Sequence, residues 1–192
     1  VMISGPIAPR LHVSADWQYT APDLFLPRTS VLSVFSAERR NDFGGGLDVE
    51  VTRDVTIGAE YHLLVEPGDD DDDYYGNELV GRLHWSRGPT SAGAEAFWLD
   101  AFENGYVGGR IFGRRDFGRV FAAADALGHF LREDVNGEDL AITGTLSGGF
   151  EFGRGWSAVL SGRAGWNPFY EQQFDGLVKL VYNQTYSVRE VR

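Results

Sequence analysis

The chain has 192 residues, enough for one domain with a substantial core. Its formal net charge of −11 and the lack of a basic stripe argue against a nucleic-acid partner, and a charged fraction of 23% argues against a disordered acidic tail. It contains no cysteine, which excludes disulfides and zinc–thiolate sites, and no run of ~18 apolar residues that would predict a transmembrane helix.

Apolar and polar residues alternate with a period of two along most of the chain, and this pattern predicts β-strands. The alternation starts at residues 11–19 and continues over 43–51, 57–65, 79–85, 92–102, 107–113, 120–130, 140–152, 156–166 and 176–188. Alanine makes a helix a competitor over residues 120–131, but the neighbouring pattern favours a strand there. We therefore expect an all-β, antiparallel, up-and-down architecture of about ten strands, or up to twelve if residues 30–35 contribute.

The links between the predicted strands alternate in length, apart from a short fifth link near residues 103–105. Short links fall at residues 53–54, 87–91, 115–119 and 153–155, and longer ones at 21–42, 66–77, 132–139 and 167–175. Short turns should therefore gather at one end of the sheet and longer loops at the other. No domain break interrupts the pattern, so we expect a single domain over residues 1–192, with strands over 10–189 after an N-terminal segment at 1–9.

Apart from Asp100 near the end of the strand predicted over 92–102, the apolar face of the predicted strands carries no charged residue, and it contains many glycines and alanines. A packed core needs side-chain volume at nearly every position, whereas a lipid-facing surface needs only to lack charge. Aromatic residues gather near the two strand ends on this face, as they do at the two interfaces of a bilayer. The predicted aromatic girdles consist of Trp17, Tyr19, Trp98, Phe130 and Trp166 at the long-loop end and Trp85, Phe150, Phe152, Trp156 and Tyr182 at the short-turn end.

The opposite face mixes charges of both signs with serine and threonine. Its charged residues are Asp16, Asp48, Glu50, Glu60, Arg82, Glu95, Arg110, Arg114, Asp125, Glu151, Arg163 and Lys179. All four histidines share its parity: His12, His62, His84 and His129. We predict that this face lines the lumen of a barrel, where opposite charges can pair.

These features together resemble the β-barrel proteins of the Gram-negative outer membrane. Strands of about ten residues with an apolar outer and a polar inner face, two aromatic girdles and short turns alternating with longer loops are typical of that family. The resemblance covers residues 10–189 and implies a transmembrane β-barrel in a bacterial outer membrane, with the lipid bilayer as its partner.

The resemblance favours a structural barrel or a narrow, porin-like channel whose lumen is plugged by paired charges, without enzymatic activity or a cofactor. Three alternatives stay open: an outer-membrane enzyme that uses lumenal or loop-end carboxylates and histidines, a soluble barrel that binds an apolar ligand, and a part of a larger porin-like barrel.

The acidic run of Asp69, Asp70, Asp71, Asp72 and Asp73 is a weak candidate for a hard-cation site. It lacks spaced ligands, so we expect a solvated loop tip and no metal site.

Overall fold

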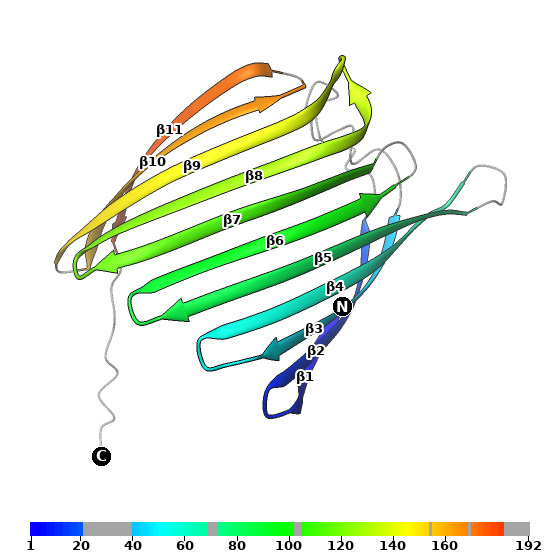
Figure 1. Ribbon diagram of the computed structural model, residues 1–192, viewed down its shortest axis with the longest axis horizontal. Helices are drawn as coiled ribbons and strands as arrows, with labels where there is room; N and C mark the ends of the chain where they lie inside the picture. The colour runs from blue at the N-terminus through cyan, green and yellow to red at the C-terminus, as the bar shows by residue number, and fades with distance from the viewer. Residues whose placement is uncertain (21–39, 69–72, 102–104, 154, 169, 183–192) are drawn as a thin grey trace.

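The chain forms one antiparallel sheet of eleven strands in a computed structural model, which describes residues 1–20, 40–68, 73–101, 105–153, 155–168 and 170–182. Each strand pairs with the next one in the sequence, so the topology is up-and-down (Figure 1). The strands are β1 (Met2–Ala8), β2 (Leu11–Thr20), β3 (Arg40–Glu50), β4 (Val55–Glu66), β5 (Tyr74–Arg87), β6 (Thr90–Asp100), β7 (Gly105–Phe117), β8 (Val120–Val135), β9 (Glu138–Gly153), β10 (Trp156–Asn167) and β11 (Tyr170–Tyr182).

The predicted all-β, antiparallel, up-and-down architecture is confirmed, and the described residues contain no helix that is long and apolar enough to cross a membrane. The alanine-rich stretch 120–131 belongs to β8, where it pairs with β7 and β9 along its length. Residues 30–35, which would have added a strand, lie outside the described residues.

Residues 1–9 are predicted to precede the first strand, and this prediction is wrong, because residues Met2–Ala8 form strand β1. It pairs with β2, with a shift in register between Pro6 and Ala8. Gly5 and Pro6 interrupt the alternation here, and proline cannot donate a hydrogen bond to a neighbouring strand, so the sequence signal is weak. The eleventh strand means that the first and last strands run in the same direction.

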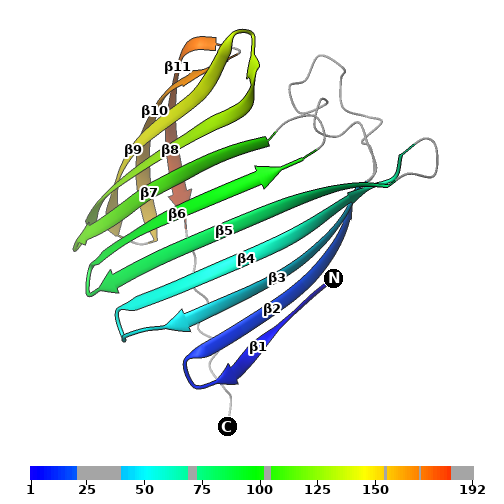
Figure 2. The same ribbon diagram turned by 45° about the vertical axis from the view of Figure 1, so that its right-hand side comes forward.

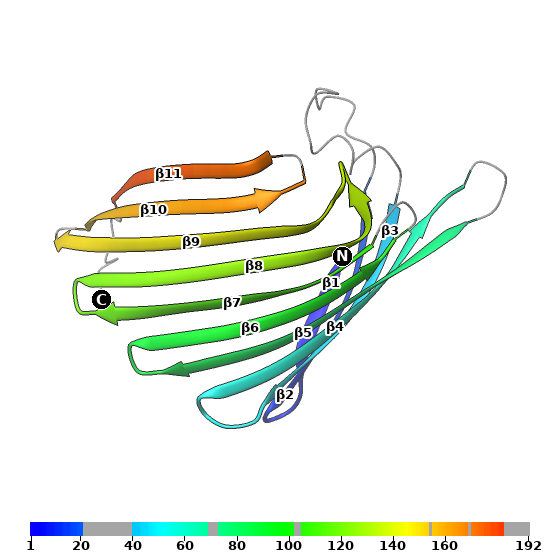
Figure 3. The ribbon, with the colours of Figure 1, turned by 45° about the horizontal axis from the view of Figure 1, so that its top comes forward.

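The sheet curves strongly and does not close within the described residues. Figures 2 and 3 show it curling from β1 at one margin to β11 at the other, and no pairing joins these two strands. Closure into a barrel therefore stays a prediction.

The short connections lie at one end of the sheet, where β1–β2, β3–β4, β5–β6, β7–β8 and β9–β10 are each joined by four residues or fewer. At the other end, two of the loops predicted to be long are much shorter than predicted. The segment 132–139 shortens to Asn136-Gly137, with φ angles of 56° and 85°, because β8 and β9 extend past their predicted ends. Asparagine followed by glycine in this left-handed region favours a two-residue hairpin turn. The segment 167–175 likewise shortens to residues 168–169.

Crowding around the glycines identifies the polar face as the concave face. A Cβ atom added to Gly44, Gly46 or Gly58, on the polar face, would overlap side chains from neighbouring strands. A Cβ atom added to Gly144 or Gly162, on the apolar face, would meet no atom within 4 Å. Side chains converge on the inside of a curved sheet and diverge on its outside, so the apolar face is convex.

The described part of the chain has almost no buried apolar core. Leu64, at 2% exposure, is its one buried hydrophobic side chain, whereas Val178 is 78% and Leu146 is 71% exposed on the convex face. The sheet therefore leaves its apolar face without a packing partner in the described structure.

Candidate functional site

The charged residues and histidines that are predicted to line a lumen lie on the concave face of the sheet. Each of them has the parity of this face in the strand that carries it. The charged set comprises Asp16, Asp48, Glu50, Glu60, Arg82, Glu95, Arg110, Arg114, Asp125, Glu151, Arg163 and Lys179, and the histidines are His12, His62, His84 and His129. The described structure brings some of these side chains into contact and leaves others apart.

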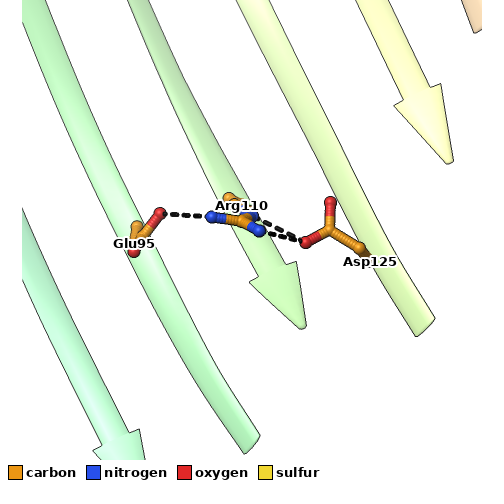
Figure 4. Close-up of polar contacts among 3 residues, drawn as sticks. All are labelled: Glu95, Arg110 and Asp125. Atoms are coloured by element: carbon orange, nitrogen blue, oxygen red, sulfur yellow. Dashed lines mark hydrogen bonds and ion pairs between the residues drawn. The ribbon is translucent and has the colours of Figure 1, made fainter. Parts of the chain in front are cut away.

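Two arginines on this face each contact two carboxylates from neighbouring strands. Arg110 on β7 lies between Glu95 on β6, at 3.5 Å, and Asp125 on β8, at 2.6 Å (Figure 4). Arg82 on β5 contacts Glu60 on β4 and lies 3.8 Å from Asp48 on β3. Because all these partners belong to adjacent or next-adjacent strands, the ion pairs run along the sheet rather than across a bore.

We call Arg82 with Asp48 and Glu60 the Arg82 group, and Arg110 with Glu95 and Asp125 the Arg110 group. Two glycines leave space for the side chains of the Arg82 group. Gly58 lies between Asp48 and Arg82 in the register, and a Cβ atom there would overlap the Asp48 carboxylate and lie 2.9 Å from Cγ of Arg82. A Cβ atom at Gly46 would lie 2.9 Å from Cγ of Glu60. Because Gly46 on β3 and Gly58 on β4 have no Cβ atom, the long charged side chains can lie over these two strands, and Arg82 on β5 approaches Asp48 on β3 across β4.

A second polar cluster surrounds His62, closer to the long-loop end. His62 Nδ1 lies 2.8 Å from Asp42 Oδ1. Gly44 separates His62 from Asp16 in the register, and Glu78 is the partner of His62 on β5. The sequence pattern predicts that Asp42 lies in the link over residues 21–42, whereas β3 begins at Arg40 in the structure and includes Asp42. The parity of Asp42, which matches Asp48, is the signal that would have found it.

Aromatic rings cover glycines on the part of the concave face formed by β6 to β9. Phe97 lies over Gly108, Phe112 over Gly93 and Phe121 over Gly149, each pair being register partners on neighbouring strands. The guanidinium of Arg114 stacks on Phe121 at 4.0 Å and that of Arg110 on Phe112 at 4.9 Å. These contacts cover part of the inner face of the sheet and hold the arginine side chains against the aromatic rings.

The ion pairs and ring contacts hold charged side chains along the concave face. The described residues contain no group of three or more histidine, aspartate and glutamate side chains placed to bind a metal ion. Asp73 is exposed, and Asp69 to Asp72 lie outside the described residues.

On the convex face the predicted girdle residues lie near the two ends of their strands. Trp17, Tyr19, Trp98 and Trp166 lie toward the long-loop end, with Phe130 several residues from the end of β8. The others lie near the short-turn end: Trp85, Phe150, Phe152, Trp156 and Tyr182. Trp156 and Tyr182, on neighbouring strands, have ring centroids 4.8 Å apart. Trp85 is partly covered, whereas most of the others are exposed.

We expect Arg110→Gln to lower the free energy of unfolding by about 1–2 kcal/mol. The substitution leaves Glu95 and Asp125 without their shared cation, and the 42% exposure of Arg110 keeps the loss below that of a buried pair. Urea titration of the folded protein would measure it. Arg163→Gln is the control, since no carboxylate in the described residues lies within 4 Å of that guanidinium; an equal loss in the control would contradict the role of the Arg110 group.

Comparison with known proteins gives no family to which this chain can be assigned: no protein-family model matches it, and no curated protein matches it.

Proposed function

We propose that this protein is an integral outer-membrane β-barrel protein whose convex face contacts lipid. The observation that carries the proposal is the apolar convex face. Leu146, Leu160 and Val178 are more than three-fifths exposed there, at 71%, 64% and 78%. An exposed apolar surface of this extent marks an interaction site, because isolated soluble proteins rarely leave one uncovered.

The polar concave face supports the same proposal. A soluble barrel that binds an apolar ligand needs an apolar interior, whereas here the inner face carries the Arg82 and Arg110 groups and the His62 cluster. Charged groups on that face can pair with each other or contact water.

Within the proposal, we favour a structural barrel or a narrow channel over an open pore. Arginine side chains and aromatic rings crowd the inner face of β6 to β9 and reduce the space that the curve encloses. A charge plug across the bore is less supported, because the Arg110 and Arg82 pairs follow the wall.

A role as part of a larger barrel is a second candidate, and the open sheet favours it. Strands β1 and β11 both have an unpaired edge within the described residues and run in the same direction. Direct pairing between them would be parallel, while every pair in the sheet is antiparallel. An odd number of additional strands would complete the sheet with antiparallel pairs throughout.

The tryptophans give a direct test of lipid contact. All five have the parity of the convex face and lie near strand ends. We expect brominated phospholipids to quench their fluorescence in reconstituted vesicles, more strongly when bromine lies near the carbonyl end of the acyl chain than near its methyl end. A water-soluble quencher should have a smaller effect than in urea-unfolded protein. A folded monomer that stays soluble without detergent and shows no lipid quenching would contradict the membrane location.

A further inference from the structure

Arginines gather at the short-turn end of the sheet. Arg10 lies between β1 and β2, Arg53 between β3 and β4, Arg87 at the end of β5, and Arg115 and Arg119 flank the turn between β7 and β8. All five side chains are exposed. The turns that carry them succeed one another along one end of the sheet (Figure 1). We call these five residues the arginine rim.

Backbone hydrogen bonds connect the successive hairpins at the short-turn end of the sheet. The carbonyl oxygens of Arg10, Asp54, Pro89 and Arg119 each accept a hydrogen bond from the next hairpin, with lengths of 2.8–2.9 Å. Their donors are the amides of Glu50, Ser86, Asp116 and Glu151, respectively. Each short turn is thus hydrogen-bonded to the next hairpin, and these bonds fix the positions of the turns that carry the arginines relative to one another.

Most of the positive charge of the rim is not neutralised by ion pairs within the described residues, although Asp54 and Asp116 lie at the same end of the sheet. Arg87 lies 3.9 Å from Asp54, but no carboxylate of the described residues lies within 4 Å of the other four guanidinium groups. The opposite end of the sheet is acidic. Its described connections and strand ends contain seven acidic residues against two arginines, Arg40 and Arg132, of which Arg132 contacts Asp100. The acidic residues are Glu66, Asp73, Asp100, Glu133, Asp134, Glu138 and Asp139. The two ends of the sheet therefore differ in the sign of their charge.

Exposed aromatic rings adjoin the rim on the convex face. Phe117 is 57% exposed, and the guanidinium of Arg115 lies 5.2 Å from the centroid of its ring. Trp156 and Tyr182 belong to the same end. Rings of this kind sit at the headgroup level of a bilayer, which places the neighbouring guanidinium groups beside lipid phosphates.

We propose that the arginine rim binds the phosphate groups of anionic phospholipids and so directs the short-turn end toward an anionic leaflet. The inference rests on the proposed membrane location. Guanidinium groups bind phosphate through paired, charge-assisted hydrogen bonds. The acidic opposite end repels the same headgroups, so binding at the rim also gives the sheet a preferred orientation.

Spin-labelled phosphatidylglycerol and phosphatidylcholine, compared by electron paramagnetic resonance on the reconstituted protein, test the inference. We expect the native chain to bind the anionic lipid several-fold more tightly at low salt, with up to about a fivefold contribution from each arginine that reaches a phosphate. The preference should vanish at about 1 M salt, where the screening length falls to about 3 Å.

The matched variants differ only in where two positive charges are removed. Arg53→Gln with Arg115→Gln should reduce the preference at least about twofold, whereas Arg163→Gln with Lys179→Gln, on the concave face, should retain it. The charge-conserving variant Arg53→Lys with Arg115→Lys should keep most of the preference for the anionic lipid. It therefore shows whether the loss in the glutamine variant comes from the missing charge or from a folding defect. Equal binding of both lipids by the native chain, or equal losses in the rim and control variants, would overturn the inference. Failure of the native chain to enter phosphatidylcholine vesicles would instead contradict the proposed membrane location.

Discussion

Replacing Leu146 by arginine should block insertion into vesicles or cost about 2–4 kcal/mol of folding free energy in the bilayer. Leu146 lies on the convex face of β9 at 71% exposure, between Ala124 and Gly162 in the register. Neither neighbour can offer a counterion, so lipid would surround the introduced charge. Folding into vesicles, followed by the mobility of unheated protein on gels, would measure the effect.

The adjacent Thr145→Arg variant is the matched control. Thr145 lies on the concave face with Asp125 and Arg163 as its register partners, so an arginine there has a carboxylate within reach. We expect a much smaller loss than for Leu146→Arg. If Leu146→Arg and Thr145→Arg fold into vesicles with equal efficiency, whether high or low, the convex face does not contact lipid.

Gly108→Ala should destabilise the sheet by about 1–3 kcal/mol. A Cβ atom at this position would overlap both the ring of Phe97 and the backbone carbonyl oxygen of Gly128. The ring can rotate away only into the neighbouring rings of Tyr106 and His129, which lie 5.9 Å and 5.0 Å from it between centroids, and the carbonyl oxygen belongs to the sheet backbone. The loss should appear as a lower urea midpoint in micelles.

Gly144→Ala makes the same chemical change on the convex face of the sheet. No atom lies within 4 Å of the added methyl group at Gly144, and alanine restricts the unfolded chain more than glycine does, so this variant should be as stable as the native protein or slightly more so. Similar destabilisation of both variants would mean that loss of glycine in a strand, rather than crowding on the concave face, causes the effect.

The all-β class, the up-and-down order of the strands and the parity of each residue along them can be predicted from the amino-acid sequence. Side chains alternate across a strand with a period of two, so the pattern that separates Leu146 from Thr145 also separates the two faces. The pattern was weakest at strand ends. Gly5 and Pro6 obscured β1, and Asn136-Gly137 replaced a predicted loop because polar residues extend β8 and β9 beyond the apolar run.

The sequence predicts that the polar parity faces inward, but the direction in which the sheet bends and the side chains that meet on its inner face are seen only in the tertiary structure. Alternation is unchanged when a sheet bends the other way; the crowded glycines Gly44, Gly46 and Gly58 reveal the direction of bending only once neighbouring strands are placed beside them. Pairing of Arg110 with Glu95 and Asp125 likewise depends on the register of three strands. The arginine rim follows from the same cause, because residues far apart in the chain become neighbours only when successive hairpins align their turns at one end of the sheet.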